Sequence, residues 1–220
     1  METLKKLLEN PFDGLNGNVQ KFQEKCAEIA KILFKNYCIE CGANKYYFAE
    51  IEFYYYEKDK WDKDWNNMTY ARNEDNPGAL YYHLSGIDIC FKSHYDESKA
   101  RFGGILIRSV KKEDGNIVAG PYSCRDELLN VCKGLCMPKL SKIKGKCNNV
   151  PNVLPALRCL GDKDKSLQIN LCFYDGNIRK EDWNPKRMVF NTKKGKIVPK
   201  YGAYKTNRFD IYNIKPFTNN

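Results

Sequence analysis

Two glutamates in an aromatic segment are the residues of this sequence best suited to acid–base chemistry. Glu50 and Glu52 lie in residues 46–56, where apolar and aromatic side chains alternate. In an extended strand every second side chain points to the same face, so Glu50, Glu52 and Tyr54 share one face. Two neighbouring carboxylates are unfavourable unless water, a cation or a reaction uses them. The pattern fits either a reactive carboxylate pair or an edge strand whose solvated acids lie opposite lysines.

A second polar cluster lies in residues 81–88, which read Tyr-Tyr-His-Leu-Ser-Gly-Ile-Asp. His83 and Asp88 place an imidazole and a carboxylate near the stackable rings of Tyr81 and Tyr82. A histidine in a strand is either a structural residue or a catalytic one, and the spacing does not decide between them. Arg108 follows an apolar strand segment, and it forms either a salt bridge to a neighbouring strand or a contact to phosphate or substrate.

The ten cysteines are scattered along the chain rather than arranged as a disulfide framework. Cys38 and Cys41 form a C-x-x-C pair, and Cys132 with Cys136 forms a looser one. A zinc site would need a second tight cysteine pair or a spaced histidine pair, and the sequence contains only two histidines. Several cysteines fall at apolar positions, where a thiol packs as a small hydrophobic group. We therefore expect reduced core thiols, no metal and no cofactor.

The elements that would position these residues follow from hydrophobic periodicity. Residues 18–36 carry apolar side chains at three- and four-residue steps, which predicts an amphipathic helix. A second helix is expected from Ser123 to Cys132, with Ser123 as its capping residue. Alternation and aromatic or β-branched content predict strands over residues 46–56, 79–91, 104–110, 166–174 and 208–214.

Two segments between these elements lack such periodicity. Residues 57–77 are polar and contain Trp61 and Trp65, so we expect a long loop, and long loops in compact domains are often functional. Residues 138–156 are rich in Pro, Lys and Asn and are expected to be irregular.

Length and composition fit one α+β domain over residues 1–220. Hydrophobic residues make up 42% and charged residues 29% of the chain, which is typical of a globular protein. No apolar run approaches the roughly eighteen residues that a membrane helix needs. The first residues lack the apolar stretch and cleavage site of a secretory signal. We therefore expect a monomer in the cytoplasm, without membrane contact.

Positive charge gathers in the C-terminal part of the chain. The net charge is +10, and residues 137–205 contain 16 Lys and Arg against 5 Asp and Glu. A basic region in a chain expected inside the cell favours nucleic acid as the partner. The candidate phosphate-binding residues are Lys142, Lys144, Lys146, Lys193, Lys194 and Lys196. A lysine-rich surface maintained for solubility is the alternative.

Taken in order, short motifs across residues 15–213 resemble the alkyladenine (3-methyladenine) DNA glycosylase family. The family's strand motif Glu-x-Glu-Ala-Tyr is similar to Glu50-Ile-Glu52-Phe-Tyr54. Its Pro-Gly-Thr-Leu-Tyr segment and its later Gly-Met are similar to Pro77-Gly-Ala-Leu-Tyr81 and Gly86-Ile87. Further similar segments are Leu106-Ile-Arg108-Ser, Gly120-Pro-Tyr-Ser, Lys186-Arg187-Met-Val and Asn207-Arg208-Phe209.

The resemblance implies a DNA repair enzyme that excises alkylated or deaminated purines by flipping the nucleotide into a pocket. It implies an α+β domain with a curved mixed or antiparallel sheet flanked by helices. Glu52 falls on the family's general base, which deprotonates a water and directs it at the sugar C1′. This role requires an acid exposed in a ring-lined cavity. Base excision by water needs no lysine nucleophile, so a monofunctional hydrolase without lyase chemistry is implied.

The resemblance also suggests residues that bind the substrate. Tyr54 falls on a base-stacking tyrosine, His83 on a second ring position, and Arg108 on the family's strand arginine near the site. Glu50 accompanies them on the same strand face. Ser85 stands where the family has a tyrosine that fills the gap left by the flipped base.

The serine at that position leaves the nature of the substrate open. Either Trp61 and Trp65 fill the gap in the duplex, or the substrate is not a duplex lesion. Two other functions also stay open: a catalytically inactive member of the same fold that binds nucleic acid or a nucleotide, and a cysteine-rich metal-binding protein.

Overall fold

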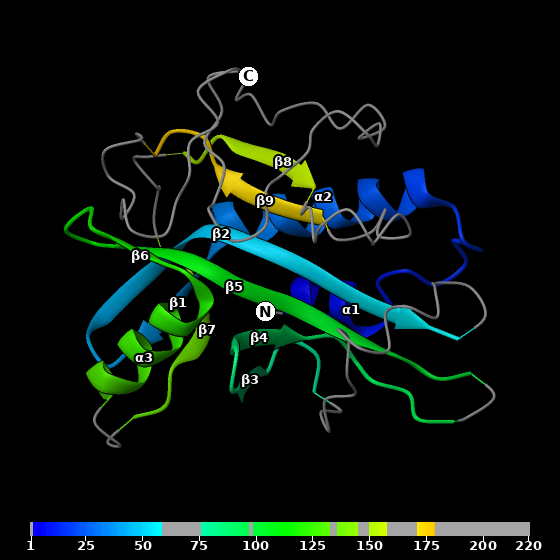
Figure 1. Cartoon of the computed structure of the whole chain (residues 1–220), viewed down its shortest axis with the longest axis horizontal. Helices are drawn as coiled ribbons and strands as arrows, with labels where there is room; N and C mark the ends of the chain where they lie inside the picture. The colour runs from blue at the N-terminus through cyan, green and yellow to red at the C-terminus, as the bar shows by residue number, and fades with distance from the viewer. Residues whose placement is uncertain are drawn as a thin grey trace.

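The described part of the chain forms a curled antiparallel sheet with three helices packed on it (Figure 1). It is a computed structural model, which describes residues 2–58, 76–96, 99–132, 136–144, 150–157 and 171–178. Every strand pairing among these residues is antiparallel. The predicted α+β class is therefore confirmed, and the described sheet is antiparallel rather than mixed.

The sheet places its longest strand in the centre. Its main path runs β3 (Leu80–His83), β4 (Gly86–Cys90), β5 (Arg101–Lys112), β2 (Asn44–Glu57), β1 (Tyr37–Cys41) and β7 (Lys139–Lys142). In addition, β6 (Ile117–Ala119) pairs with β5, and β9 (Leu171–Asp175) pairs with both β2 and β8 (Val153–Leu157). One edge of β2 therefore carries β5, and the other carries β1 and then β9.

Helices lie on both sides of this sheet. Helix α2 (Val19–Asn36) packs against β1, β2, β8 and β9 and passes behind them in Figure 1, and α3 (Pro121–Cys132) packs against β1, β4, β5 and β6 in front. Helix α1 (Glu2–Glu9) contacts α2. None of the helices in the described ranges has the length and apolar character that crossing a membrane requires.

The two predicted helices are confirmed, one of them with a different start. Asn18 caps α2, because its side chain accepts a hydrogen bond from the backbone N–H of Lys21 at 3.0 Å. Helix α3 begins at Pro121 rather than at Ser123. Proline is well suited to the first helical position, since its fixed φ is helical and its missing N–H would have no partner there.

The apolar face of β2 packs against α2 and the N-terminal segment. Ile51, Phe53 and Tyr55 are buried on this face, and the ring of Phe12 lies 4.5 Å from that of Tyr55 between centroids. Phe22 of α2 lies 6.2 Å from the same tyrosine. This packing directs the alternate residues of β2 toward the other face of the sheet, on the side of α3.

Two predictions about strands are wrong. The strand predicted over residues 79–91 is a hairpin of β3 and β4, with a turn at Leu84 and Ser85. The apolar Leu84 continued the hydrophobic pattern of a strand through the turn, although its side chain is 82% exposed there. Residues 138–156 contain β7 and the start of β8 rather than irregular chain alone.

Other predictions are confirmed over the residues that are described. The strands predicted over residues 46–56 and 104–110 lie within β2 and β5, and the one predicted over residues 166–174 overlaps β9. Sequence reasoning missed α1, β1 and β6. The loop with Trp61 and Trp65 and the strand over residues 208–214 lie outside the described residues.

Candidate functional site

Two carboxylates of β2 share the guanidinium of Arg108 on the neighbouring strand β5. The Arg108 Nε donates to Oε1 of Glu50 at 3.0 Å, and Nη1 donates to Oε2 of Glu52 at 2.6 Å. The Ser109 hydroxyl donates to the other Glu50 oxygen at 3.2 Å. These four residues are called the carboxylate–arginine cluster below. Their contacts confirm that Glu50 and Glu52 share a strand face.

An irregularity in the pairing of β2 with β5 brings the arginine to both acids. Glu50 lies opposite Ser109, whereas Ile51 lies opposite Ile107, so the register skips Arg108. A break of this kind bends a strand and re-aims the side chain at that position. Here the arginine side chain reaches both carboxylates, while its carbonyl accepts the backbone N–H of Gly120 at 2.8 Å.

The cluster is buried, which corrects two expectations about the acids. Glu52 is 0% exposed, Glu50 is 4% exposed and Arg108 is 6% exposed. Glu52 is therefore not exposed in a cavity, and β2 is not an edge strand with solvated acids. The physical reason is that β2 lies between two strands at this point, where Glu52 faces Leu106 of β5 and Cys172 of β9. Buried charges require a partner, and Arg108 provides it.

Helix α3 covers this cluster through Cys124. The Cys124 sulfur lies 3.5 Å from the carbonyl oxygen of Arg108. Burial raises the pKa of the Cys124 thiol, and the negative charge of Glu50 raises that pKa further. The thiol therefore stays neutral, and its sulfur lies against the backbone carbonyl oxygens of Arg108 and Val118.

His83 and Asp88 form a second polar pair at the hairpin of β3 and β4. The His83 Nε2 lies 3.2 Å from Oδ2 of Asp88, and Nδ1 accepts the backbone N–H of Ser85 at 3.2 Å. Because Nδ1 accepts this hydrogen bond, the ring is oriented with Nε2 beside the carboxylate of Asp88. The rings of Tyr81 and His83 stack with centroids 6.0 Å apart.

The pairing register relates this pair to the carboxylate–arginine cluster. Leu106 lies opposite both Glu52 and Asp88, so these two acids point to the same face from strands on either side of β5. Neighbouring strands are about 4.8 Å apart, which separates the two backbones by about 10 Å. Tyr81 of β3 lies opposite Asp88. Glu52, Leu106, Asp88 and Tyr81 therefore form one row of residues across four neighbouring strands.

The remaining predicted site residues lie on either side of that row. Tyr54 is opposite Gly104, two residues along β2 from Glu52, and is 7% exposed. His83 is opposite Gly86, beyond Asp88 in the other direction. Ser85 lies in the exposed turn, where its backbone N–H orients the His83 ring. Sequence reasoning missed Ser109 and Cys124, since neither the bulge nor the covering helix leaves a local signal.

Of the predicted phosphate-binding lysines, the two that the structure describes lie away from this cluster. Lys142 and Lys144 are exposed at the end of β7, the edge strand two places from β2. Lysines on an edge strand also discourage pairing with another sheet, which is a purely structural role. Lys146, Lys193, Lys194 and Lys196 lie outside the described residues.

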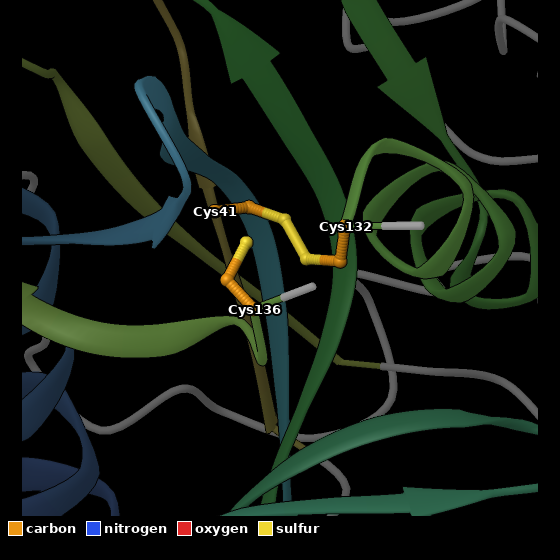
Figure 2. Close-up of side chains that lie close together, drawn as sticks. All are labelled: Cys41, Cys132 and Cys136. Atoms are coloured by element: carbon orange, nitrogen blue, oxygen red, sulfur yellow. A yellow bond between two sulfur atoms is a disulfide. The ribbon is translucent and has the colours of Figure 1, made fainter. Parts of the chain in front are cut away.

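Three cysteine sulfurs meet where the β1–β2 hairpin approaches the end of α3. Cys41 and Cys132 are joined by a disulfide, and Cys136 lies beside them (Figure 2). The expectation of reduced thiols is therefore wrong for the bonded pair. It is confirmed for five other described cysteines, whose thiols are reduced and buried: Cys26, Cys38, Cys90, Cys124 and Cys172.

Comparison with known proteins gives no relative from which a role could be assigned. No protein-family model, no curated protein and no solved structure matches this chain. The function must therefore be argued from the geometry of its own residues.

Proposed function

We propose that this chain is a monofunctional DNA glycosylase, acting as a monomer in the cytoplasm, that hydrolyses the N-glycosidic bond of damaged purines. The observation that carries the proposal is the contact between Glu52 and Arg108, which are 56 positions apart in the sequence. The family resemblance places both residues in one site, as base and as orienting cation. Their 2.6 Å hydrogen bond supports that assignment, as does the antiparallel α+β architecture.

The chemistry of base excision needs two things from Glu52. A carboxylate must accept a proton from the attacking water, and its charge must stabilise the positive sugar that develops as the bond breaks. The charge-assisted hydrogen bond from Arg108 fixes the orientation of the carboxylate. The resemblance assigns base stacking to both Tyr54 and His83. Because β5 and β4 lie between β2 and β3, the backbones of these two residues are about 14 Å or more apart, so we propose Tyr54, two residues from Glu52, as the ring that stacks on the flipped base.

The burial of Glu52 sets a condition on this mechanism. Because its side chain is 0% exposed, water reaches the carboxylate only when covering side chains move. The nucleotide must therefore bind preferentially to an opened form of the site, and its binding energy shifts the protein toward that form. In the free protein the carboxylate–arginine cluster is the closed form.

A second candidate is a protein of the same fold that binds nucleic acid or a nucleotide without hydrolysis. The full burial of both acids favours it, since a purely structural cluster would have the same contacts. In that case Glu50 and Glu52 are equivalent partners of Arg108. Their individual substitutions then have the same consequences.

A single-turnover excision assay separates the two candidates. The full chain is incubated with duplex and single-stranded oligonucleotides that carry one hypoxanthine or one 7-methylguanine, and hot alkali cleaves the abasic sites. We expect base release by the unmodified protein, none by Glu52→Gln and retained release by Glu50→Gln. The Glu50 variant is a matched control because it removes the same charge from the same cluster. Equal loss in both variants, or binding without any release, favours the second candidate.

The salt dependence of binding tests the DNA partner separately. Phosphate contacts release counterions, so log Kd must rise with log salt concentration. Replacing Lys142 and Lys144 by Ala should reduce that slope by about 1 for each lysine that contacts a phosphate. Binding that is indifferent to salt contradicts a phosphate interface.

A further inference from the structure

We propose that Cys41, Cys132 and Cys136 form a zinc site that fastens the β1–β2 hairpin to the end of α3. The three sulfur atoms all lie within 4.8 Å of one another. Sulfurs around a tetrahedral zinc ion, at a Zn–S distance of about 2.3 Å, are separated by about 3.8 Å. Coordination by all three requires that the Cys41–Cys132 bond be reduced. A small thiol such as glutathione supplies the two electrons and two protons and leaves as its own disulfide, and small movements of the side chains then bring the three thiolates around the ion as it displaces their protons.

The three ligands come from separate segments that the fold brings together. Cys41 is the last residue of β1, Cys132 is the last residue of α3, and Cys136 precedes β7 (Figure 2). Three residues separate Cys132 from Cys136, which is within the spacing of paired cysteine ligands in structural zinc sites. Gly42 follows Cys41 with a φ of +60°, and a Cβ there would lie 3.7 Å from the Cys136 sulfur. The left-handed turn thus seats the hairpin against the third ligand.

The surroundings favour a cation at this point. The carbonyl groups at the C-terminus of a helix carry partial negative charge. This charge attracts a cation, and it repels thiolates that have no cation bound to them. Zinc would compensate the thiolates and complement the end of α3. Cys41 and Cys132 are 1% and 4% exposed, whereas Cys136 is partly exposed, so the site is closed on two sides and open on one.

A disulfide explains only part of this arrangement. The bond between Cys41 and Cys132 uses two of the three sulfurs and gives no role to Cys136. Within the described residues the group holds three protein ligands, which leaves one tetrahedral position for water or a small anion. The metal holds the β1–β2 hairpin against the end of α3, and this structural role is independent of the proposed glycosylase activity.

Metal content and cobalt substitution test the site. The full chain is purified with a phosphine reductant and without chelators, and zinc is measured by mass spectrometry. We expect about one zinc per chain. Replacement by Co²⁺ should give intense thiolate-to-cobalt charge-transfer bands and the visible bands of a tetrahedral ion. Zinc removal should lower the thermal midpoint of unfolding.

Matched variants assign the ligands. Cys136 is partly exposed, so Cys136→Ser should disturb folding less than a change at Cys41 or Cys132. This variant should lose bound zinc and the cobalt charge-transfer bands. Cys38→Ala is the control on the same strand as Cys41, because burial raises the pKa of the Cys38 thiol to about 11 and it lies outside the group. It should keep the metal.

Three results would overturn the zinc site. The first is the absence of zinc and of a cobalt spectrum in the unmodified chain. The second is undiminished zinc in Cys136→Ser. The third is a Cys41–Cys132 disulfide found by mass spectrometry in protein whose thiols are blocked by alkylation at the moment of cell lysis.

Discussion

The Nη1 of Arg108 donates a 2.6 Å hydrogen bond to Oε2 of Glu52, and both side chains lie in the interior of the sheet. Because Glu50 accepts from the same guanidinium at 3.0 Å, two acids share one cation. The repulsion between two buried carboxylates opposes part of their attraction to the arginine. The cluster should therefore respond to substitution in a strongly non-additive way.

We expect Glu50→Gln and Glu52→Gln each to lower the free energy of unfolding by at most about 1 kcal/mol. Each change loses a charge-assisted hydrogen bond but also removes the repulsion between the acids. The double variant leaves Arg108 as a buried charge without a carboxylate, and should lose about 3–5 kcal/mol. Urea unfolding at pH 7 measures all three values.

The double-mutant cycle then gives the coupling between the two acids. A coupling energy of about 1 kcal/mol or more is expected, with the double variant worse than the sum of the single ones. Strict additivity would mean that the two acids act on Arg108 independently.

Removing the cation should destabilise the fold strongly. In Arg108→Met the two buried acids face each other without the guanidinium that both of them contact. An uncompensated buried charge is costly, so we expect a loss of about 3–5 kcal/mol at pH 7, measured by urea unfolding.

The control for this prediction removes the acids as well. Arg108→Met combined with Glu50→Gln and Glu52→Gln leaves no uncompensated charge in the cluster. It should be more stable at pH 7 than Arg108→Met alone. A triple variant no more stable than Arg108→Met would contradict the prediction.

The sequence predicted which side chains share a face but not what surrounds them. Alternation in residues 46–56 placed Glu50 and Glu52 together, and their common contact to Arg108 confirms it. The same alternation occurs in edge and central strands. What makes β2 central is its pairing with β9, at residues more than a hundred positions later. Nothing local to the acids carries that information.

Two further features of the structure were not predicted from the sequence, for similar reasons. Strand β1 follows α2 without a glycine or proline between them, so hydrophobic periodicity gave no sign of a new element at Tyr37. The meeting of Cys41, Cys132 and Cys136 depends on how the hairpin packs on α3, and is not visible in their spacing alone. Local patterns predicted elements, whereas contacts between distant elements required the structure.

Gly103 should be among the least replaceable glycines of the described chain. A Cβ at this position would lie 2.1 Å from the Tyr54 carbonyl oxygen and 2.9 Å from the Tyr55 Cα, both backbone atoms. Gly103→Ala must push β5 away from β2 beside the candidate site, and we expect a loss of about 3 kcal/mol or more. Gly115→Ala is the control, since a Cβ there meets nothing within 4 Å and only its φ of +91° is strained.

Thermal and urea unfolding compare these two glycine variants. Gly115→Ala should cost about 1–2 kcal/mol for its left-handed backbone. A loss in Gly103→Ala no larger than that would show that the two strands can separate locally at little cost.

Tyr82→Phe should stabilise the protein, whereas Tyr46→Phe should destabilise it. The buried Tyr82 hydroxyl has no hydrogen-bond partner among the described residues, so removing it relieves about 1 kcal/mol. The Tyr46 hydroxyl donates to Glu127 at 3.1 Å, and its loss should cost about 1 kcal/mol.

Burial raises the pKa of each tyrosine to about 12, above the unfolded value of about 10. The folded state therefore holds these protons longer, and stability falls as the pH rises from about 10 toward 12. Each variant should reduce that fall, as measured by urea unfolding at pH 9 and pH 11, and an unchanged slope in both variants would contradict the burial of the two hydroxyls.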